Sequence, residues 1–367
     1  MRIEPFSLLL PKELPTKAIN AFFEASKYDI RQNLENGLYS APVKNALYVY
    51  RISTQSSSSI GVIALNDVSD FWEGKIKKHE KTLTRREEEY VTLLKEWTAV
   101  IKPVLLTYPS KPVITEWLVQ FSIANLPMID FKMEETGEQH QLWAVTEPSD
   151  LEALQTFFSE LVDCVYIADG HHRTTTIANL SKAPEGTQGN LDFSRLFSAY
   201  FSEDQLDILG YHRLLTLPDG LSVDQLLSGL QNWFEVEQLP QARFPSAKRE
   251  FLVLTDSGTF RLTLKEEAER HLLDAHLLNE YVFSGVLGLQ DIRSASSIRY
   301  IEGSKSLSEL HQFAGPDQVL FLLHPVSFED LFYLSDLGLD LPPKSTWFEP
   351  RIKSGLAVYS LVHSTLA

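Results

Sequence analysis

The stretch LVDCVYIADGHHRTTTIANL, residues 161–180, starts as an apolar run and then becomes strongly polar within a few positions. Its first part, VDCVYIA, has the length and the β-branched and aromatic content of a buried strand. Asp169-Gly170 is a turn signal that ends this strand, and the polar residues after it begin a helix. The stretch therefore predicts a buried strand, a tight turn and a helix at the centre of the fold.

The residues just before this stretch predict one more strand and one more helix. LWAVT (142–146) has strand character, and EPSDLEALQTFFSELV (147–162) has helical character with Ser149 as its N-cap. Residues 142–180 together therefore predict the order strand, helix, strand, turn, helix.

Strands and helices alternate through the rest of the chain. LYVYRI (47–52) and IGVIAL (60–65) predict a hairpin around a serine-rich loop. Thr84, followed three residues later by Glu87, predicts a helix that opens with a capping box. The apolar face expected for this helix comprises Tyr90, Leu93, Leu94 and Trp97. Two apolar runs within 195–215 predict paired strands.

This mixture predicts the α+β class, with mixed sheets and flanking helices. The chain has 367 residues, of which 44% are hydrophobic, and this supports more than one lobe. We expect an N-terminal lobe over residues 1–120 with the hairpin and the capped helix. A central lobe over 121–215 should carry the Asp-Gly turn, and a C-terminal lobe should cover 216–367.

The composition of the chain disfavours several classes of partner. Acidic residues outnumber basic ones by 49 to 33, and the net charge of −16 repels nucleic-acid backbones. No apolar run approaches the roughly 20 residues that cross a bilayer, and the N-terminal FSLLL is too short for a signal peptide. The single cysteine, Cys164, cannot form an internal disulfide. We expect a cytoplasmic protein that binds neither nucleic acid nor membrane, and a homodimer is compatible with this.

Five adjacent residues make the turn a candidate anion site. They are Asp169, Gly170, His171, His172 and Arg173. A helix start presents unpaired N–H groups and partial positive charge, and glycine lets the backbone approach a ligand closely. Arginine binds phosphate oxygens, histidine moves protons, and aspartate can hold Mg²⁺ or orient a histidine. We predict that Gly170, His171, His172, Arg173 and Thr174 bind a phosphate or nucleotide; the alternative is an ordinary turn with exposed polar neighbours.

The ADGHHR run resembles the signature of a bacterial family called domain of unknown function 1015. Further segments along nearly the whole chain resemble other blocks of this family. They are YVYRI with GVIAL, IKKHEKT with RREEEY, LDILGYHRLL, and PPKSTWFEPRIKSGL (342–356). One position departs from the pattern, because the family often has Tyr and Glu after the arginine where this chain has Thr174 and Thr175.

The Asp-Gly-His-His-Arg run also resembles the phosphate-binding motif of the ParB and sulfiredoxin superfamily. This resemblance implies a ParB/sulfiredoxin-like core with additional lobes, and a bound nucleotide, ADP or ATP, with Mg²⁺ at Asp169. The free-serine kinases of the superfamily carry a similar Asp-Gly-His-x-Arg run, which implies phosphoryl transfer to a small hydroxyl amino acid. Sulfiredoxin chemistry is disfavoured, because histidine stands here in place of the motif cysteine.

Two other segments offer residues that would complete such a site. In KKHEKT, His79 and Glu80 join Asp169 and His172 as candidate catalytic residues, and Glu80 would accept a proton from a hydroxyl substrate. A stiff polar loop near the C-terminus and a basic pair near a strand end offer substrate contacts. The candidates are Lys344, Ser345, Thr346, Trp347, Glu349 and Arg213. The alternatives are exposed charges before a helix and a structural plug.

The sequence leaves three functions open. The first is a nucleotide-dependent phosphotransferase acting on serine or phosphoserine, with a small anionic ligand at the turn. The second is a ParB-like nucleotide-binding regulatory protein without turnover. The third is a metal-dependent hydrolase that uses His79, Glu80, His171 and His172.

Overall fold

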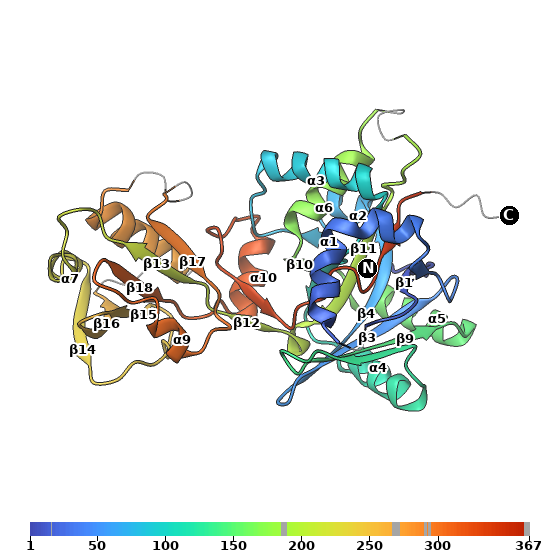
Figure 1. Ribbon diagram of the computed structural model, residues 1–367, viewed down its shortest axis with the longest axis horizontal. Coiled ribbons are helices and arrows are strands. Elements are labelled where there is room, and N and C mark those ends of the chain that lie inside the picture. Colours follow the sequence, from blue (N-terminus) through green and yellow to red (C-terminus); the bar gives the residue numbers. More distant parts are fainter. Residues whose placement is uncertain (16, 185–188, 266–271, 290–291, 293–294, 363–367) are drawn as a thin grey trace. The chain divides into compact units, whose positions relative to one another are not determined.

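The computed structural model describes residues 1–15, 17–184, 189–265, 272–289, 292 and 295–362. The chain divides into two compact units: unit 1 comprises Met1–Asp207 and Pro350–Ala367, and unit 2 comprises Ile208–Glu349. Both units contain sheets with flanking helices (Figure 1), which confirms the predicted α+β class. The boundary expected between residues 120 and 121 falls inside unit 1, because strands from both sides of it pair in one sheet.

A mixed eight-stranded sheet forms the centre of unit 1. In sheet order, its strands are β5 (Ile76–Lys77), β10 (Val165–Asp169), β7 (Val104–Tyr108), β11 (Arg195–Ser202), β4 (Ser58–Asp67), β3 (Leu47–Ser53), β9 (Gln139–Val145) and β8 (Ile129–Lys132). β3 and β4 form the predicted hairpin. β10 is parallel to β5 on one side and antiparallel to β7 on the other, so the strand that leads into the Asp-Gly turn is paired along both edges.

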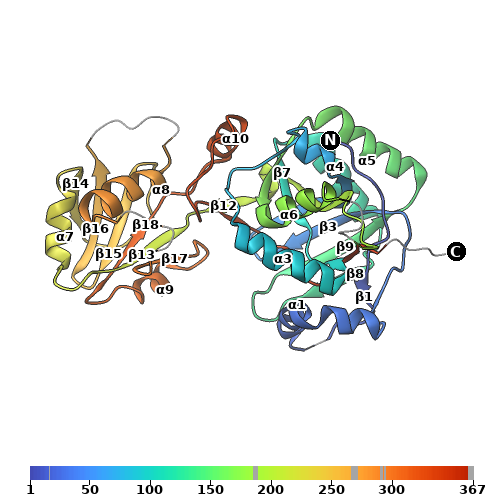
Figure 2. The same cartoon turned by 90° about the horizontal axis from the view of Figure 1, so that it is seen from above.

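Helices flank this sheet. They are α1 (Ile19–Glu35), α2 (Ser69–Trp72), α3 (Thr84–Trp97), α4 (Pro112–Ala124), α5 (Pro148–Leu161) and α6 (His171–Ser181). α3 packs along α6, the helix that follows the turn (Figures 1 and 2). The predicted apolar face of α3 is confirmed: Leu94 and Trp97 are buried, and Tyr90 and Leu93 pack against the cluster that contains Trp97.

Two predicted helix caps are wrong. Thr84 is the first residue of α3 rather than its cap, and the Glu87 carboxylate accepts a hydrogen bond from the Thr82 hydroxyl at 2.5 Å. The cap position of α5 belongs to Glu147 and not to Ser149, because a proline occupies the first turn of this helix. The fixed φ of proline suits that position and leaves no amide hydrogen unsatisfied there.

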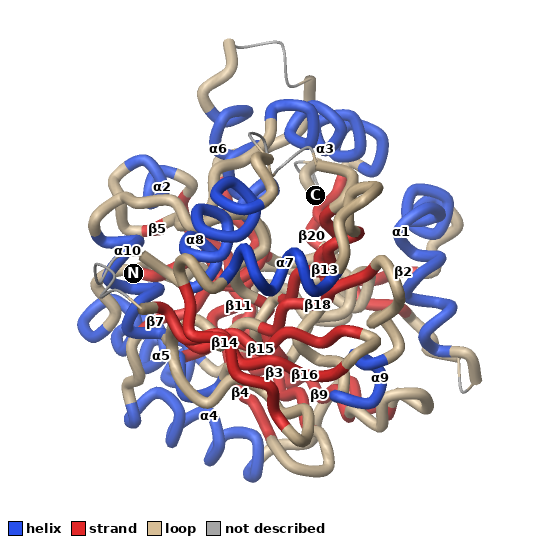
Figure 3. The backbone as a smooth tube through the Cα atoms, turned by 90° about the vertical axis from the view of Figure 1, so that its left-hand side faces the viewer, coloured by secondary structure: helices blue, strands red, loops and turns tan. Residues whose placement is uncertain are grey.

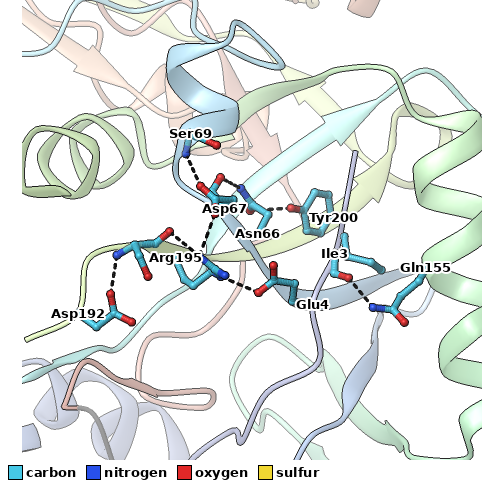
Figure 4. A network of polar contacts seen from close by, with 10 residues as sticks. Ile3, Glu4, Asn66, Asp67, Ser69, Gln155, Asp192, Arg195 and Tyr200 are labelled. Carbon is cyan, nitrogen blue, oxygen red and sulfur yellow. Dashed lines mark hydrogen bonds and ion pairs between the residues drawn. The ribbon is translucent and has the colours of Figure 1, made fainter. Parts of the chain in front are cut away.

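A polar network fastens the N-terminal segment to the sheet of unit 1 (Figure 4). The Arg195 guanidinium donates to Glu4 at 2.6 Å and to Asp67 at 2.9 Å. Next to this pair, the side-chain oxygen of Asn66 accepts from the Tyr200 hydroxyl at 2.7 Å. These residues satisfy one another across β4, β11 and the N-terminal segment, so we interpret the network as structural.

Unit 2 is built on a six-stranded sheet. In sheet order, its strands are β14 (Phe234–Leu239), β16 (Gly258–Leu264), β15 (Glu250–Thr255), β18 (Gln318–Leu322), β13 (His212–Thr216) and β17 (Ile298–Ile301). One face is covered by α7 (Val223–Leu230) and by α8 (Asp274–Leu277), which continues as the π-helix Leu278–Val286. α9 (Leu307–His311) covers the other face (Figures 2 and 3).

The predicted pairing of the two runs within 195–215 is wrong. β11 pairs with β4 and β7 in unit 1, whereas β13 pairs with β17 and β18 in unit 2. α10 (Phe328–Asp336) also belongs to unit 2. β12 (Asp207–Leu209), which begins at the last residue before unit 2, pairs with β19 (Trp347–Glu349). Within the described residues, no helix has the length and apolar character that a bilayer span requires.

Candidate functional site

The turn after β10 places Asp169 against two cations. Its Oδ2 accepts hydrogen bonds from Nζ of Lys102 at 2.8 Å and from Nη2 of Arg173 at 2.9 Å. Burial alone would raise the pKa of this carboxyl. The charges of Lys102 and Arg173, aided by Arg351, outweigh burial and hold the pKa of Asp169 well below its usual range. Asp169 is therefore an anion that organises the cations around it.

Two of the three side-chain nitrogens of Arg173 donate hydrogen bonds to other groups of the protein. Besides Asp169, it binds two backbone carbonyls: its Nη1 donates to the oxygens of Lys102 at 2.8 Å and Pro103 at 2.6 Å. The guanidinium thus joins the start of α6 to the chain that enters β7. Nε and the second Nη2 hydrogen are the donors that it can offer to a ligand.

Gly170 has a conformation and a neighbour that exclude a side chain. Its φ of 112° lies in the region that favours glycine, and a Cβ there would lie 2.9 Å from Nη2 of Arg173. We expect Gly170→Ala to lower the free energy of unfolding by about 2–3 kcal/mol, because backbone strain adds to a displaced guanidinium. Chemical denaturation followed by circular dichroism measures this.

Gly74→Ala is the matched control for this substitution. Gly74 also has a positive φ, 75°, but a Cβ there would meet nothing within 4 Å. Gly74→Ala should therefore lower the free energy of unfolding by about 1 kcal/mol, from backbone strain alone. Equal losses at both positions would contradict the packing of Arg173 over Gly170.

Two histidine rings meet at the N-terminus of α6. The rings of His79 and His171 pack edge to face with their centroids 4.3 Å apart, and both side chains are buried. The backbone N–H of His79 donates to Nε2 of His171 at 3.4 Å, so the neutral His171 ring carries its proton on Nδ1. That nitrogen lies 3.9 Å from Oε2 of Glu80, which is half-buried.

Both histidines are neutral at physiological pH. Burial lowers the pKa of His79 to about 3 and, with a further contribution from His79, lowers the pKa of His171 well below its usual value. In the described residues, Nδ1 of His79 is buried without a hydrogen-bond partner. The pair therefore offers hydrogen bonds and proton acceptors next to Glu80, while the fixed positive charge comes from Lys102 and Arg173.

The cations outnumber the carboxylates at the turn itself. Lys102 and Arg173 share the single carboxylate of Asp169 as hydrogen-bond partner, which leaves a surplus of positive charge within a chain of net charge −16. Burial lowers the pKa of Lys102, and the charge of Asp169 opposes that effect. The positive end of the α6 dipole lies at the same place. A buried positive surplus at a helix start suits a phosphate group.

The structure brings together most of the residues predicted for this site. His79, Glu80, Asp169, Gly170, His171 and Arg173 are linked by the contacts above. Thr174 is fully buried, and its hydroxyl donates to the oxygen of Gly170 at 3.1 Å, so its side chain faces the helix rather than a ligand. His172 is half-buried in the first turn of α6.

One residue of the site, Lys102, was missed in the sequence. Lys102 lies two residues before β7, and β7 pairs with β10, so its proximity to Asp169 follows from strand pairing that local sequence does not reveal. Arg351, whose charge also lowers the pKa of Asp169, lies in the stiff polar loop that the sequence offered for ligand contacts. A search for cations next to predicted neighbouring strands is the signal that would have found Lys102.

Asp169 does not fit the predicted role of a Mg²⁺ ligand. One of its carboxylate oxygens, Oδ2, is hydrogen-bonded to two cations, whose charges repel a further positive ion at this carboxylate. Among the residues that the structure describes, no group of three His, Cys, Asp or Glu side chains is arranged to hold a metal ion. We therefore assign no step to a metal held by these residues.

Arg213 was predicted to contact a substrate. It is buried in unit 2, where its guanidinium connects two segments of the chain. Its Nη1 donates to the oxygen of Tyr211 at 2.8 Å, and its Nη2 donates to the oxygen of Pro343 at 3.1 Å. The guanidinium also lies over the Tyr300 ring, 4.5 Å from its centroid. Burial lowers the pKa of Arg213 to about 10. These contacts hold the loop that starts at Leu341 against β13.

The other candidates of unit 2 lie in that loop. Ser345 donates to the oxygen of Pro342 at 2.7 Å and lines a cavity of about 510 Å³ with Asp274 and His324. Burial raises the pKa of Asp274 to about 6. The further candidates are Lys344, which is exposed, and Thr346, Trp347 and Glu349, which are half-buried. Their contact with a substrate stays a prediction.

Several solved structures are similar to this chain. One is SbnI with a C-terminal truncation from Staphylococcus aureus, at 15% identity and a TM-score of 0.43, covering 80% of this chain and 85% of that chain. Another is a mutant free serine kinase in complex with AMP, at 13% identity and a TM-score of 0.44, covering 82% and 92%. A third is a mutant free serine kinase in complex with ADP, at 15% identity and a TM-score of 0.41, covering 82% and 92%.

The ADGHHR signature and the blocks around it predicted a particular bacterial family. No curated protein matches the chain. A family model does match, with the description "Protein of unknown function (DUF1015)", over residues 6–282. That range contains the whole of α6, the turn before it and the His79-Glu80 pair. Because the match covers well over half of the sequence, the chain belongs to the DUF1015 family.

Proposed function

We propose that the turn at Asp169-Gly170 binds the phosphate groups of a nucleotide and that the protein transfers a phosphoryl group to a small hydroxyl amino acid. One observation carries the proposal: two largely buried cations share one carboxylate at the start of α6, and His171, in the first turn of that helix, faces a proton-accepting carboxylate at 3.9 Å. Lys102 and Arg173 supply the charge, and Glu80 beside His171 supplies the acceptor.

Phosphate binding follows from the electrostatics of the turn. The first N–H groups of a helix have no partner within the helix and point outward along its axis, where they bind anions. Positioning and charge neutralisation account for most of the catalysis of phosphoryl transfer. In this proposal, Lys102, Arg173 and the α6 N-terminus hold the terminal phosphates of ADP or ATP.

Glu80 is the proposed general base. The hydroxyl oxygen of the substrate forms a bond to the terminal phosphorus, the bond from that phosphorus to the nucleotide oxygen breaks, and the hydroxyl proton moves to Glu80. The Glu80 side chain is 34% exposed, and Nδ1–H of His171 faces its carboxylate at 3.9 Å. A neutral His171 orients the carboxylate without neutralising its charge.

The resemblance of the Asp-Gly-His-His-Arg run to free-serine kinases supports serine as the substrate class. The run keeps the acid, the glycine, the first histidine and the arginine of that motif. We assign no protein ligand to Mg²⁺. The phosphate oxygens of the nucleotide would bind the ion.

The test of this proposal is a turnover assay on the full chain. Purified protein is incubated with Mg²⁺, L-serine and either ADP or ATP, and phosphoserine is followed by ³¹P nuclear magnetic resonance. We expect a phosphoserine resonance with at least one nucleotide. Nucleotide binding without turnover of serine or phosphoserine would overturn the kinase and favour the regulatory alternative.

A further inference from the structure

β8 forms one end of the eight-stranded sheet, so one of its two edges is open. Its paired edge runs antiparallel to β9, with Asp130 opposite Gln141 and Lys132 opposite Gln139. Within the described residues, no strand pairs with the other edge. Such an edge presents unpaired N–H and C=O groups that can bind another strand.

One hydrogen bond at the end of β8 shows which backbone groups face the open edge. The N–H of Met133 donates to the oxygen of Glu138 at 2.7 Å, which continues the register with β9. Along an antiparallel pair, residues that bond to the partner strand alternate with residues that do not. Phe131 therefore bonds to β9, whereas the N–H and C=O groups of Asp130 and Lys132 point away from the sheet.

Asp130 and Lys132 carry opposite charges on one face of the sheet, because they are two residues apart in a strand. Both side chains are exposed. The Asp130 carboxylate accepts from Nε2 of Gln139 at 2.7 Å and from Nε2 of Gln141 at 3.0 Å, which leaves sites for a further donor. Among the residues that the structure describes, Nζ of Lys132 has no carboxylate partner.

We infer that the open edge of β8 pairs with β8 of a second copy of this chain, antiparallel about a two-fold axis at Phe131. In this register, Asp130 lies opposite Lys132 of the second copy, and the outward N–H and C=O groups of the two residues bind each other. The same pair recurs on the other side of the axis, because the interface is isologous. The inference is independent of the proposed function, since no residue of the turn after β10 takes part.

The same residues exclude the neighbouring registers. A shift by one residue would set outward-facing backbone groups against groups that already bond to β9. An axis at Asp130 or at Lys132 would place like charges opposite each other, which destabilises a strand pair. A lysine on an edge strand usually prevents pairing, but the register about Phe131 gives it a carboxylate partner.

Two exposed apolar side chains lie beside this edge. Ile123 is at the end of α4, and Leu126, three residues before β8, is 93% exposed. The oxygen of Asn125 accepts from Nε1 of Trp143 at 3.1 Å, which holds the link between α4 and β8 against β9. The register about Phe131 brings the hairpin between β8 and β9 of the second copy alongside this link. Burial of Leu126 there would add hydrophobic stabilisation.

Sedimentation velocity on the full chain tests the inference at protein concentrations of about 1–100 µM. We expect a reversible equilibrium between monomer and dimer in the wild type. Asp130→Lys and Lys132→Glu each place like charges opposite each other on both sides of the axis. Each should weaken dimerisation about 10- to 100-fold. The double variant restores opposite charges in the same register, so it should dimerise within about fivefold of the wild type.

Lys95→Glu is the matched control. Lys95 is exposed on α3, which packs along α6, and the substitution changes the net charge as Lys132→Glu does. It should leave dimerisation unchanged; equal weakening would assign the effect to net charge and overturn the inference. A wild-type chain that stays monomeric at about 100 µM would also overturn it, as would a double variant that stays as weak as the single ones. The proposed function would stand in each case.

Discussion

Replacing Asp169 with alanine is expected to lower the free energy of unfolding by about 2–3 kcal/mol, less than for a fully buried pair, since Asp169 is the partner of two largely buried cations and is itself 33% exposed. The side chains of Lys102 and Arg173 are 18% and 14% exposed, so water screens them poorly once Asp169 is gone. Urea denaturation of the full chain, followed by circular dichroism, measures the loss.

The pH dependence gives this prediction a second readout. The pKa of Asp169 is depressed in the folded state, so its stabilising contribution is present above the ordinary carboxyl pKa of about 4 and is lost as the pH falls through the folded pKa. The difference between wild type and Asp169→Ala should therefore be largest near neutral pH and shrink in acid.

Glu35→Ala is the control for this stability measurement. Glu35 pairs with Arg31 on the surface of α1, where both side chains are more than 60% exposed. Such a pair contributes about 0.3–0.5 kcal/mol. If Asp169→Ala lowers the free energy of unfolding no more than Glu35→Ala does, Asp169 does not neutralise the cations at the turn, and the electrostatic description of the turn is wrong.

Replacing Glu80 with glutamine is expected to reduce turnover about 10²- to 10⁴-fold, the usual contribution of a general base. Glutamine has the same shape but cannot accept the proton of the substrate hydroxyl. Because Glu80 lies next to His171, and phosphate binding is assigned to Lys102 and Arg173, nucleotide affinity should change by less than about threefold. Phosphoserine formation and calorimetric binding, measured on the same sample, separate the two effects.

Glu88→Gln is the matched control for this substitution. Glu88 lies nearby in sequence, on the exposed face of α3. It should leave both turnover and affinity unchanged. Full turnover in Glu80→Gln would show that the proton goes to another group.

The strand, turn and helix around Asp169 could be predicted because their signals are local. An apolar run, an Asp-Gly pair and a polar helix start follow one another within 20 residues. The apolar face of α3 was equally local, with a spacing that only a helix brings to one side. The predicted caps at Thr84 and Ser149 were wrong, because several adjacent residues can each begin a helix. In α5, the proline in the first turn determines where the helix begins.

The pairing of strands across the chain could not be predicted. Neighbouring runs often pair, and residues 195–215 were assigned accordingly. The chain instead passes from one unit to the other at residue 207, so β11 and β13 belong to different sheets. No local pattern marks that passage.

The partners of Arg173 depend on contacts between distant segments. Its position in the sequence suggested that the whole guanidinium group could bind phosphate. In the structure, the carbonyls of residues 102 and 103 and the Asp169 carboxylate accept most of its hydrogen bonds. Lys102 approaches the turn from 67 residues before Asp169. Tertiary packing, which spacing along the chain does not encode, assembles this cluster.

The most direct test of the central claim is calorimetric titration of the wild-type chain with ADP and ATP, beside the Lys102→Met variant. Asp169 and Arg173 still pair in that variant, so the turn keeps its shape while the positive surplus falls. We predict saturable binding to the wild type that weakens with salt, and at least about tenfold weaker binding to Lys102→Met. Absence of binding at nucleotide concentrations of about 1 mM, or equal affinity in the two proteins, would contradict the account.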